Sequence, residues 1–239
     1  MNAVDPETAR ELVTALEQCR GESKIRVVIV TGSGGAFCAG GDLKYCSRFL
    51  GSNPVEPIRE LTDCFHRIIL DIRILPKPVI AAVNGVAAGG GMSLALACDL
   101  RIAAADAQFR QAYTGVGLVP DAGWSLWVSL LSGFGRASEM LFLDPVIDAG
   151  QALQMGLVHK VVAPGELAEE TSRLGARLAE GPARAHALAK AALNRGLLGA
   201  LEYQLEVERQ GVLQAAGTRD FREGLTAFLE KRRPRFLGE

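Results

Sequence analysis

Lys77 to Asp99, KPVIAAVNGVAAGGGMSLALACD, has the order strand, turn and helix around a run of three glycines. Pro78 to Val83 is an uncharged run rich in valine, isoleucine and alanine, which is typical of a parallel strand buried on both faces. Asn84-Gly85 predicts a turn, and the length and composition of Met92 to Cys98 favour a short buried helix. Gly89 to Gly91 therefore fall at a helix N-terminus, where free N–H groups and the helix dipole attract negative charge.

Two other interpretations fit this stretch taken alone. Pro78 to Cys98 carries no charge, which is compatible with a membrane helix. However, Asn84 and four glycines interrupt the run, and no second apolar segment of similar length accompanies it. The glycines can also serve close packing of a helix on a sheet. A second glycine-rich site is needed to decide between packing and ligand binding.

A second glycine-rich loop follows the predicted strand Arg26 to Thr31. It reads GSGGAFCAGGDL from Gly32 to Leu43. No Gly-Lys-Ser/Thr follows, which excludes a Walker loop, and Phe37 stands where the third glycine of a dinucleotide fingerprint belongs. Together, the two glycine loops can each direct one backbone N–H at the same carbonyl oxygen. That is the arrangement of an oxyanion hole.

AFCAGGDL (Ala36 to Leu43) together with KPVIAAVNGVAAGGG (Lys77 to Gly91) resembles the enoyl-CoA hydratase/isomerase, or crotonase, superfamily. The resemblance extends from the first predicted helix to Phe236. It implies an acyl-CoA thioester as the substrate, with coenzyme A arriving as part of that substrate and no permanently bound cofactor. It also implies that the N–H groups of Gly41 and Gly90 hold the thioester carbonyl and stabilise an enolate-like intermediate.

Composition by itself supports an α/β fold with one main domain, since 49% of the 239 residues are hydrophobic. The resemblance implies a crotonase-like spiral of β-β-α units followed by a helical C-terminal region that builds a homotrimer or a dimer of trimers. We place a crotonase-like core with both loops at 1–181 and the helical C-terminal region at 182–239. The strand pair that usually precedes the first helix in the family is missing, which indicates either a shortened sheet edge or a start placed too late.

Apolar periodicity predicts the helices around these loops. Asp5-Pro6-Glu7 combines an N-cap, a first-turn proline and an acidic residue favourable to the helix dipole. Pro54 to Ile74 carries apolar residues at helical spacing, whereas Tyr113 to Trp124 is predicted to be a loop. The other predicted helices are Ser125 to Leu131, Ala137 to Leu143, Asp148 to Met155, Glu166 to Glu180, Pro182 to Arg195, Leu201 to Ala215 and Phe221 to Lys231. The other predicted strands are Asp99 to Ala105, Ala107 to Arg110 and Leu157 to Val162.

Charge and cysteine content exclude several classes of protein. A net charge of −1 leaves no basic field for nucleic acid. The five scattered cysteines form no C-x-x-C pair, and the three histidines are far apart in sequence, so neither disulfides nor a metal site is indicated. The polar, acidic start MNAVDPETARE is unlike a secretory signal. We therefore predict a cytoplasmic protein without a metal, a nucleic-acid partner or a membrane partner.

Members of the resembled family differ in the side chain that transfers the substrate proton, and this side chain determines which reaction is catalysed. Family hydratases use two glutamates, whose positions fall on Ser93 and Tyr113 here, and neither residue replaces a carboxylate at neutral pH. Asp121, in GLVPDAG, stands where the resembled double-bond isomerases, including the phenylacetate-pathway ring isomerases, carry a catalytic aspartate. The resemblance thus favours an enoyl-CoA isomerase in which Asp121 removes a proton from one carbon and returns it two carbons away. A turn or N-cap role is the alternative for Asp121.

Other reactions remain open from the sequence. In the related chlorobenzoyl-CoA dehalogenases an aspartate at the position of Asp121 attacks the aryl ring and a histidine occupies the position of His66. A dehalogenase or hydrolase with Asp121 as nucleophile is therefore one alternative, and a hydratase-type lyase is another. A non-enzymatic RNA-binding or scaffold module would predict a basic patch and broken oxyanion loops, and the sequence has neither.

The resemblance also suggests which residues bind the substrate. We assign Tyr113 and His66 to the acyl-binding site, although a partly buried packing histidine is the alternative for His66. Phe228 and Lys231, in AFLEK, are expected to reach the coenzyme A of a neighbouring subunit. Core packing for Phe228 and a solvated charge for Lys231 are the alternatives. Tyr113, with Trp124 and Trp127, hints at a ring-shaped acyl group, but the sequence does not identify it.

Overall fold

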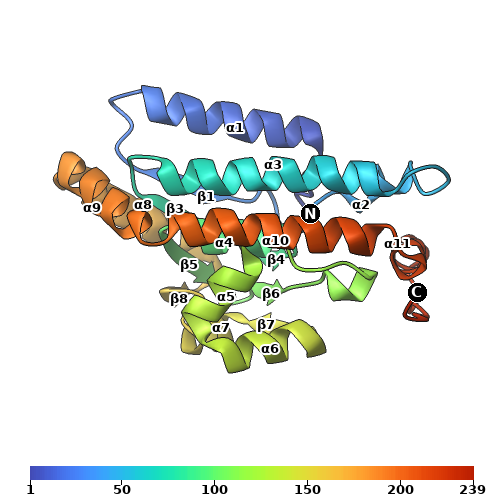
Figure 1. Ribbon diagram of the computed structural model, residues 1–239. Coiled ribbons are helices and arrows are strands. Elements are labelled where there is room, and N and C mark those ends of the chain that lie inside the picture. The colour runs from blue at the N-terminus through green and yellow to red at the C-terminus, as the bar shows by residue number, and fades with distance from the viewer.

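The computed structural model describes all residues, 1–239, as two four-stranded sheets surrounded by helices (Figure 1). From β1 to β6, strands that follow one another in sequence alternate between the two sheets, and β7 then joins the sheet of β6. The first sheet has the order β1-β3-β5-β8 and is parallel throughout, and the second has the order β2-β4-β6-β7 with only β7 antiparallel. Because the pairs β1–β2, β3–β4 and β5–β6 are each followed by helix, the chain forms the predicted spiral of β-β-α units. The strands are β1 (Val28–Thr31), β2 (Ala36–Cys38), β3 (Val79–Val83), β4 (Val86–Ala88), β5 (Leu100–Ala104), β6 (Gln108–Arg110), β7 (Ile147–Asp148) and β8 (Lys160–Val162).

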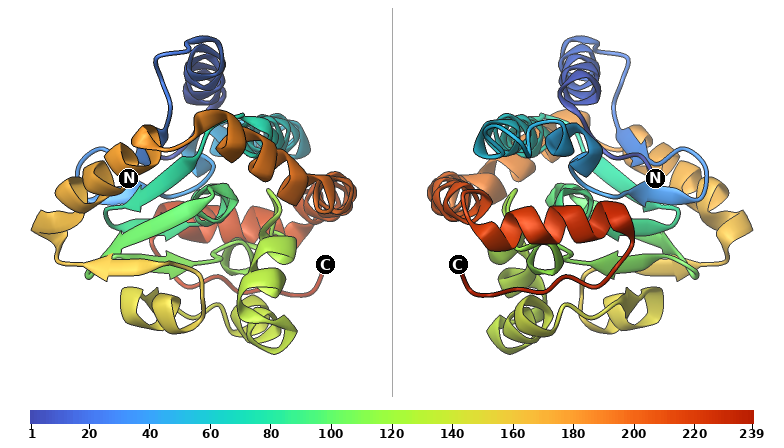
Figure 2. Two further views of the ribbon diagram at one scale, coloured as in Figure 1. Left: turned by 90° about the vertical axis from the view of Figure 1, so that its left-hand side faces the viewer. Right: turned by 90° about the vertical axis from the view of Figure 1, so that its right-hand side faces the viewer.

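The helices form the outer layers of the molecule. Three long ones, α1, α3 and α10, lie side by side along one flank, and Figure 2 shows them end-on. The helices are α1 (Pro6–Gly21), α2 (Leu43–Ser47), α3 (Val55–Ile74), α4 (Gly90–Ala97), α5 (Trp124–Ser132), α6 (Phe134–Leu143), α7 (Ala149–Gln154), α8 (Leu167–Glu180), α9 (Ala183–Arg195), α10 (Leu198–Ala216) and α11 (Arg219–Glu230), with 3₁₀ turns η1 (Thr114–Val116) and η2 (Pro164–Glu166).

The stretch with three glycines folds largely as predicted. Every residue of β3 is buried, as its uncharged sequence indicated, and α4 begins at Gly90 and is buried along its whole length. The sequence analysis missed β4 between them, and it also missed β2 and α2 in the first glycine loop. Strands of three residues flanked by glycine are too short to show an alternating pattern.

The start of the chain supports the first glycine loop. Asp5 caps α1 as predicted, with its carboxylate accepting the Thr8 N–H at 2.8 Å. Just before this cap, the Val4 N–H donates to the Gly40 carbonyl at 2.8 Å, and the Asp42 N–H donates to the Val4 carbonyl at 2.9 Å. The N-terminal segment therefore pairs with the loop and fixes the backbone on both sides of Gly41.

The C-terminal helices share the core of the rest of the chain. The predicted division at 181/182 coincides with the break between α8 and α9. Leu201 and Leu205 of α10 nevertheless belong to the main hydrophobic core. On α9, Lys190 Nζ donates to the Ile72 carbonyl at 2.9 Å and to Asp99 Oδ2 at 2.6 Å. Whether the two parts are separate domains, and whether the second builds a trimer, stays a prediction.

Candidate active site

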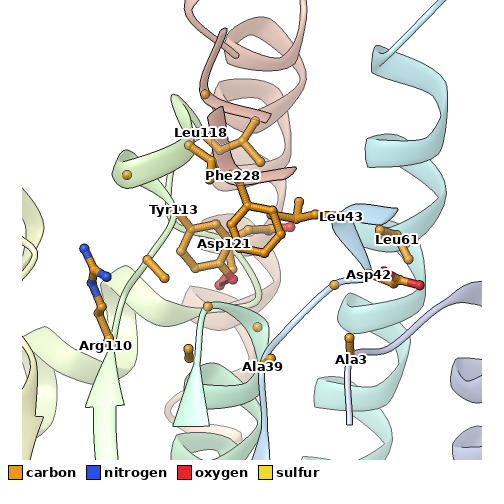
Figure 3. A pocket seen from close by; sticks show the side chains of 18 of the residues that line it. Ala3, Ala39, Asp42, Leu43, Leu61, Arg110, Tyr113, Leu118, Asp121 and Phe228 are labelled. Atoms are coloured by element: carbon orange, nitrogen blue, oxygen red, sulfur yellow. Dashed lines mark hydrogen bonds between the residues drawn. The ribbon is translucent and has the colours of Figure 1, made fainter. Parts of the chain in front are cut away.

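A cavity of about 820 Å³ lies where the two glycine loops meet α3, α11 and the loop after β6. Its wall includes Asp121 and the apolar side chains of Leu61 and Leu118 (Figure 3), and Val212 also lines it. Sixteen of the 29 lining residues are hydrophobic, which suits an apolar acyl chain, and the charged ones are Asp42, Lys44, Arg110, Asp121 and Arg232. The cavity thus brings together the glycine loops and the acidic residue that the sequence analysis singled out separately.

Pairing of β2 with β4 sets the two glycine loops side by side. Gly40 has a φ of 90°, and a Cβ built on it would lie 2.9 Å from the Gly90 nitrogen. The N–H of Gly41 makes no hydrogen bond within the chain. Gly90 is the first residue of α4, so its N–H has no intrahelical acceptor. Both glycines line the cavity with unpaired N–H groups. That the two donors form an oxyanion hole stays a prediction.

Asp121 is a buried carboxylate on the cavity wall, with 5% of the residue exposed. Its Oδ1 lies 2.6 Å from His66 Nε2, and this is the only side-chain hydrogen bond of its carboxylate. His66 extends from α3 but does not itself line the cavity. In the structure His66 contacts Asp121. It does not line the cavity, although the sequence analysis assigned it to the acyl-binding site. Its assignment to substrate binding stays a prediction.

The two positions that carry glutamates in hydratases hold hydroxyl groups, and both hydroxyls bond to the same atom. Ser93 Oγ donates to the Asp121 carbonyl at 2.9 Å, and the Tyr113 hydroxyl donates to it at 3.2 Å. Burial, with a further contribution from the charge of Asp121, raises the pKa of Tyr113 well above its usual value. Tyr113 thus remains a protonated donor at neutral pH. Ser93 and Tyr113 fix the backbone of Asp121, and the ring of Tyr113 also lines the cavity.

The sequence analysis missed Glu208, which supports the turn after Asp121 from α10. Its carboxylate accepts the Gly123 N–H at 2.7 Å and the Ser125 N–H at 2.9 Å, so it caps α5 from another helix. Burial, and to a lesser degree the nearby charge of Asp121, raises its pKa to about 7. The sequence does contain a signal: Glu208 falls in the same helical register as Leu205 and Val212, which predicts a buried carboxylate.

The two C-terminal residues predicted for substrate binding lie in different places. Phe228 of α11 lines the cavity, with its ring in front of Asp121 in the view of Figure 3, and is 52% exposed. Lys231 follows the end of α11 with a φ of 55°, is exposed, and is not part of the cavity wall. Contact of either residue with a neighbouring subunit stays a prediction.

No group of three or more His, Cys, Asp or Glu side chains is placed to hold a metal ion. None of the helices combines the length and the hydrophobicity that a bilayer-spanning helix needs. The groups that the site brings together are two N–H donors, one buried carboxylate and its imidazole neighbour.

Comparisons with known proteins point to one family. The family profile described as "Enoyl-CoA hydratase/isomerase" matches residues 1–239. The "Probable enoyl-CoA hydratase" of Rhodobacter capsulatus is 40% identical over all of this chain and 90% of that protein, and the "1,2-epoxyphenylacetyl-CoA isomerase" of Escherichia coli is 36% identical over all of this chain and 91% of that protein. The crystal structure of an enoyl-CoA hydratase from Mycobacterium avium subsp. paratuberculosis superimposes with a TM-score of 0.88 at 34% identity, covering 98% of this chain and 89% of that one.

Proposed function

The chain belongs to the enoyl-CoA hydratase/isomerase family, and on that premise we propose that it is an enoyl-CoA double-bond isomerase in which Asp121 carries the proton. The substrate is a 3-enoyl thioester of coenzyme A whose carbonyl oxygen accepts the N–H groups of Gly41 and Gly90. By precedent, one such donor contributes about 3 to 4 kcal/mol to transition-state stabilisation.

The isomerisation needs a single base that removes a proton from one carbon and then delivers a proton to another. The carboxylate of Asp121 removes a proton from C2, and the electrons of the C–H bond pass into the thioester carbonyl, forming a dienolate. The protonated Asp121 then delivers a proton to C4. The carbonyl is restored, the double bond moves to C2–C3, and Asp121 is again a carboxylate.

One observation carries the proposal: Asp121 is the only buried carboxylate on the cavity wall. The other, Asp42, caps α2 by accepting the Lys44 N–H at 2.8 Å. Ser93 and Tyr113 are committed to the Asp121 carbonyl. The site therefore lacks the pair of carboxylates with which family hydratases hold and split water, while it has what proton transfer between two carbons requires.

Hydration is the second candidate, because relatives with hydratase names match this chain as fully as the isomerase does. The test compares the wild type with Asp121→Asn on a 3-enoyl-CoA and on crotonyl-CoA. We expect the wild type to form the conjugated 2-enoyl-CoA and to hydrate crotonyl-CoA poorly, and Asp121→Asn to lose at least ~10²-fold in isomerisation. Hydration by the wild type that is faster than isomerisation would overturn the proposal.

A further inference from the structure

Arg110 places a guanidinium group on the cavity wall beside the glycines that begin α4. It pairs with Ala88 where β6 runs next to β4, and its carbonyl accepts the Gly89 N–H at 3.1 Å. Side chains alternate along a strand, and since Phe109 is buried in the core, Arg110 faces the opposite side. The arginine side chain therefore lines the cavity from a position close to Gly90, where we place the thioester carbonyl.

One buried carboxylate orients this guanidinium. Arg110 Nη2 lies 2.7 Å from Asp144 Oδ2, and Asp144 is itself fixed because its Oδ1 accepts the Ala112 N–H at 2.9 Å. The side chain of Asp144 is 10% exposed, whereas that of Arg110 is 48% exposed. Asp144 is the only acidic partner of Arg110, and the Nε and Nη1 groups of Arg110 make no hydrogen bond within the chain. The guanidinium is thus held in place and keeps donors for a second acceptor.

The wall around the ion pair offers no such acceptor from a side chain. Ala112, Gly115 and Val146 line the cavity here and carry no polar side-chain group. A Cβ built on Gly115 would lie 3.3 Å from Asp144 Oδ2 and 3.8 Å from Arg110 Nη2, so the glycine keeps the guanidinium uncovered. Water satisfies the free donors when the cavity is empty. A bound acyl group that displaces this water must supply an acceptor itself, or the donors are left unpaired.

Arg110 lies on the same wall of the cavity as the proposed proton-transfer group. Tyr113 follows it by three residues and donates its hydroxyl to the Asp121 carbonyl at 3.2 Å. In the view of Figure 3, Arg110 and Asp42 stand on opposite sides, with Tyr113 and Asp121 between them. An acyl chain whose C2 to C4 lie at Asp121 can therefore direct its distal end along this wall toward Arg110.

We propose that Arg110 binds a carboxylate on the distal part of the acyl group, so that the preferred substrate is the coenzyme A monothioester of an unsaturated dicarboxylic acid. The inference rests on the proposed function, because it takes C2 to C4 of the acyl chain to lie beside Asp121. The planar fork of N–H donors on arginine matches a carboxylate, and Asp144 sets the orientation of the fork from the protein side. An acyl chain that ends in a methyl group leaves these donors unpaired, so the enzyme discriminates against it.

The test measures kcat/KM for isomerisation of substrates in pairs, 3-hexenoyl-CoA with 3-hexenedioyl-CoA and 3-octenoyl-CoA with 3-octenedioyl-CoA. The wild type should prefer the dicarboxylic member of at least one pair by roughly 10-fold, a value that allows for the partial exposure of Arg110. In Arg110→Gln this ratio should fall toward one, mainly through a higher KM for the dicarboxylic substrate. Arg59→Gln is the matched control, because Arg59 is also ion-paired and has a 42% exposed side chain but does not line the cavity. It should keep the wild-type ratio.

Two results would overturn the carboxylate site. One is a wild type that favours the dicarboxylic member of neither pair, and this result does not depend on any variant. The other is an Arg110→Gln enzyme that loses kcat/KM equally on both members of a pair, which shows that Arg110 acts on the coenzyme A part of the substrate or on the fold.

Failure of the isomerase proposal is recognised separately with saturated thioesters, which bind but cannot isomerise. The dissociation constants of hexanoyl-CoA and adipoyl-CoA, and of octanoyl-CoA and suberoyl-CoA, are measured by calorimetry. Tighter binding of a dicarboxylic thioester that is lost in Arg110→Gln, in an enzyme that isomerises no 3-enoyl-CoA, means that the isomerase function is wrong and the carboxylate site is right. Isomerisation without any such preference means the reverse.

Discussion

Replacing Glu208 by glutamine is expected to remove a pH dependence from the stability of the protein. Glu208 is 3% exposed and accepts hydrogen bonds from the N–H groups of Gly123 and Ser125. Burial, and to a lesser degree Asp121, raises its pKa from 4.5 to about 7, while these hydrogen bonds act in the opposite direction. The ionised form of this carboxyl group is therefore the costly one in the folded state.

The direction and size of the effect follow from that pKa. A folded-state pKa above the unfolded value of 4.5 means that the native chain binds the proton more tightly than the unfolded chain. The stabilisation from protonated Glu208 is fully present below pH 4.5 and is lost as the pH rises through about 7. The shift corresponds to ~3 kcal/mol.

Denaturant unfolding of the wild type and Glu208→Gln across this pH range, at one protein concentration, measures the effect. The difference in unfolding free energy, wild type minus variant, should shrink by ~3 kcal/mol as the pH rises, because glutamine does not titrate. Glu206→Gln is the control on the same helix. Hydrogen bonds from Gln210 and Arg209 lower the pKa of Glu206, so its contribution has the opposite sign. A wild-type–Glu208→Gln difference that stays constant or grows with pH would refute the reasoning.

Substitutions at two positions test the cavity wall. Gly41→Pro removes the free N–H and should lower kcat by ~10²- to 10³-fold. Gly41→Ala keeps the N–H and places a Cβ near the Leu61 side chain alone, 3.1 Å from Cδ1. Steady-state rates should therefore separate the two variants. Equal losses would contradict the oxyanion role. Phe228→Ala removes a half-exposed ring from the cavity and should raise KM for acyl-CoA with kcat largely kept; an unchanged KM would mean that the ring does not bind substrate.

Much of the fold could be predicted because the long elements carry strong periodic signals. The helix predicted at Pro54 to Ile74 is α3, and the uncharged strand before the glycines is β3. The three-residue strands β2 and β4 could not be predicted from pattern, since their pairing with each other, and not local sequence, makes them strands. The resemblance of the glycine loops to the family nevertheless predicts that Gly41 and Gly90 share one site, and both line the cavity.

The site could be predicted only where a residue's identity implies its chemistry. The sequence shows that Ser93 and Tyr113 are not glutamates, but it does not show that both hydroxyls bond to the carbonyl of Asp121. That contact depends on how α4 packs against the loop after β6. The bond between His66 and Asp121 likewise joins residues 55 positions apart, and no spacing rule connects them.

The most direct test of the central claim is the fate of the Asp121 side chain during turnover in ¹⁸O water. A proton carrier never forms an ester, so we predict that mass spectrometry of the Asp121 peptide after a single turnover finds no heavy oxygen while the isomerised thioester accumulates. A nucleophile would form an aspartyl ester whose hydrolysis leaves one heavy oxygen on the carboxylate. Heavy oxygen in that peptide, absent from Asp121→Asn treated in the same way, would contradict the account.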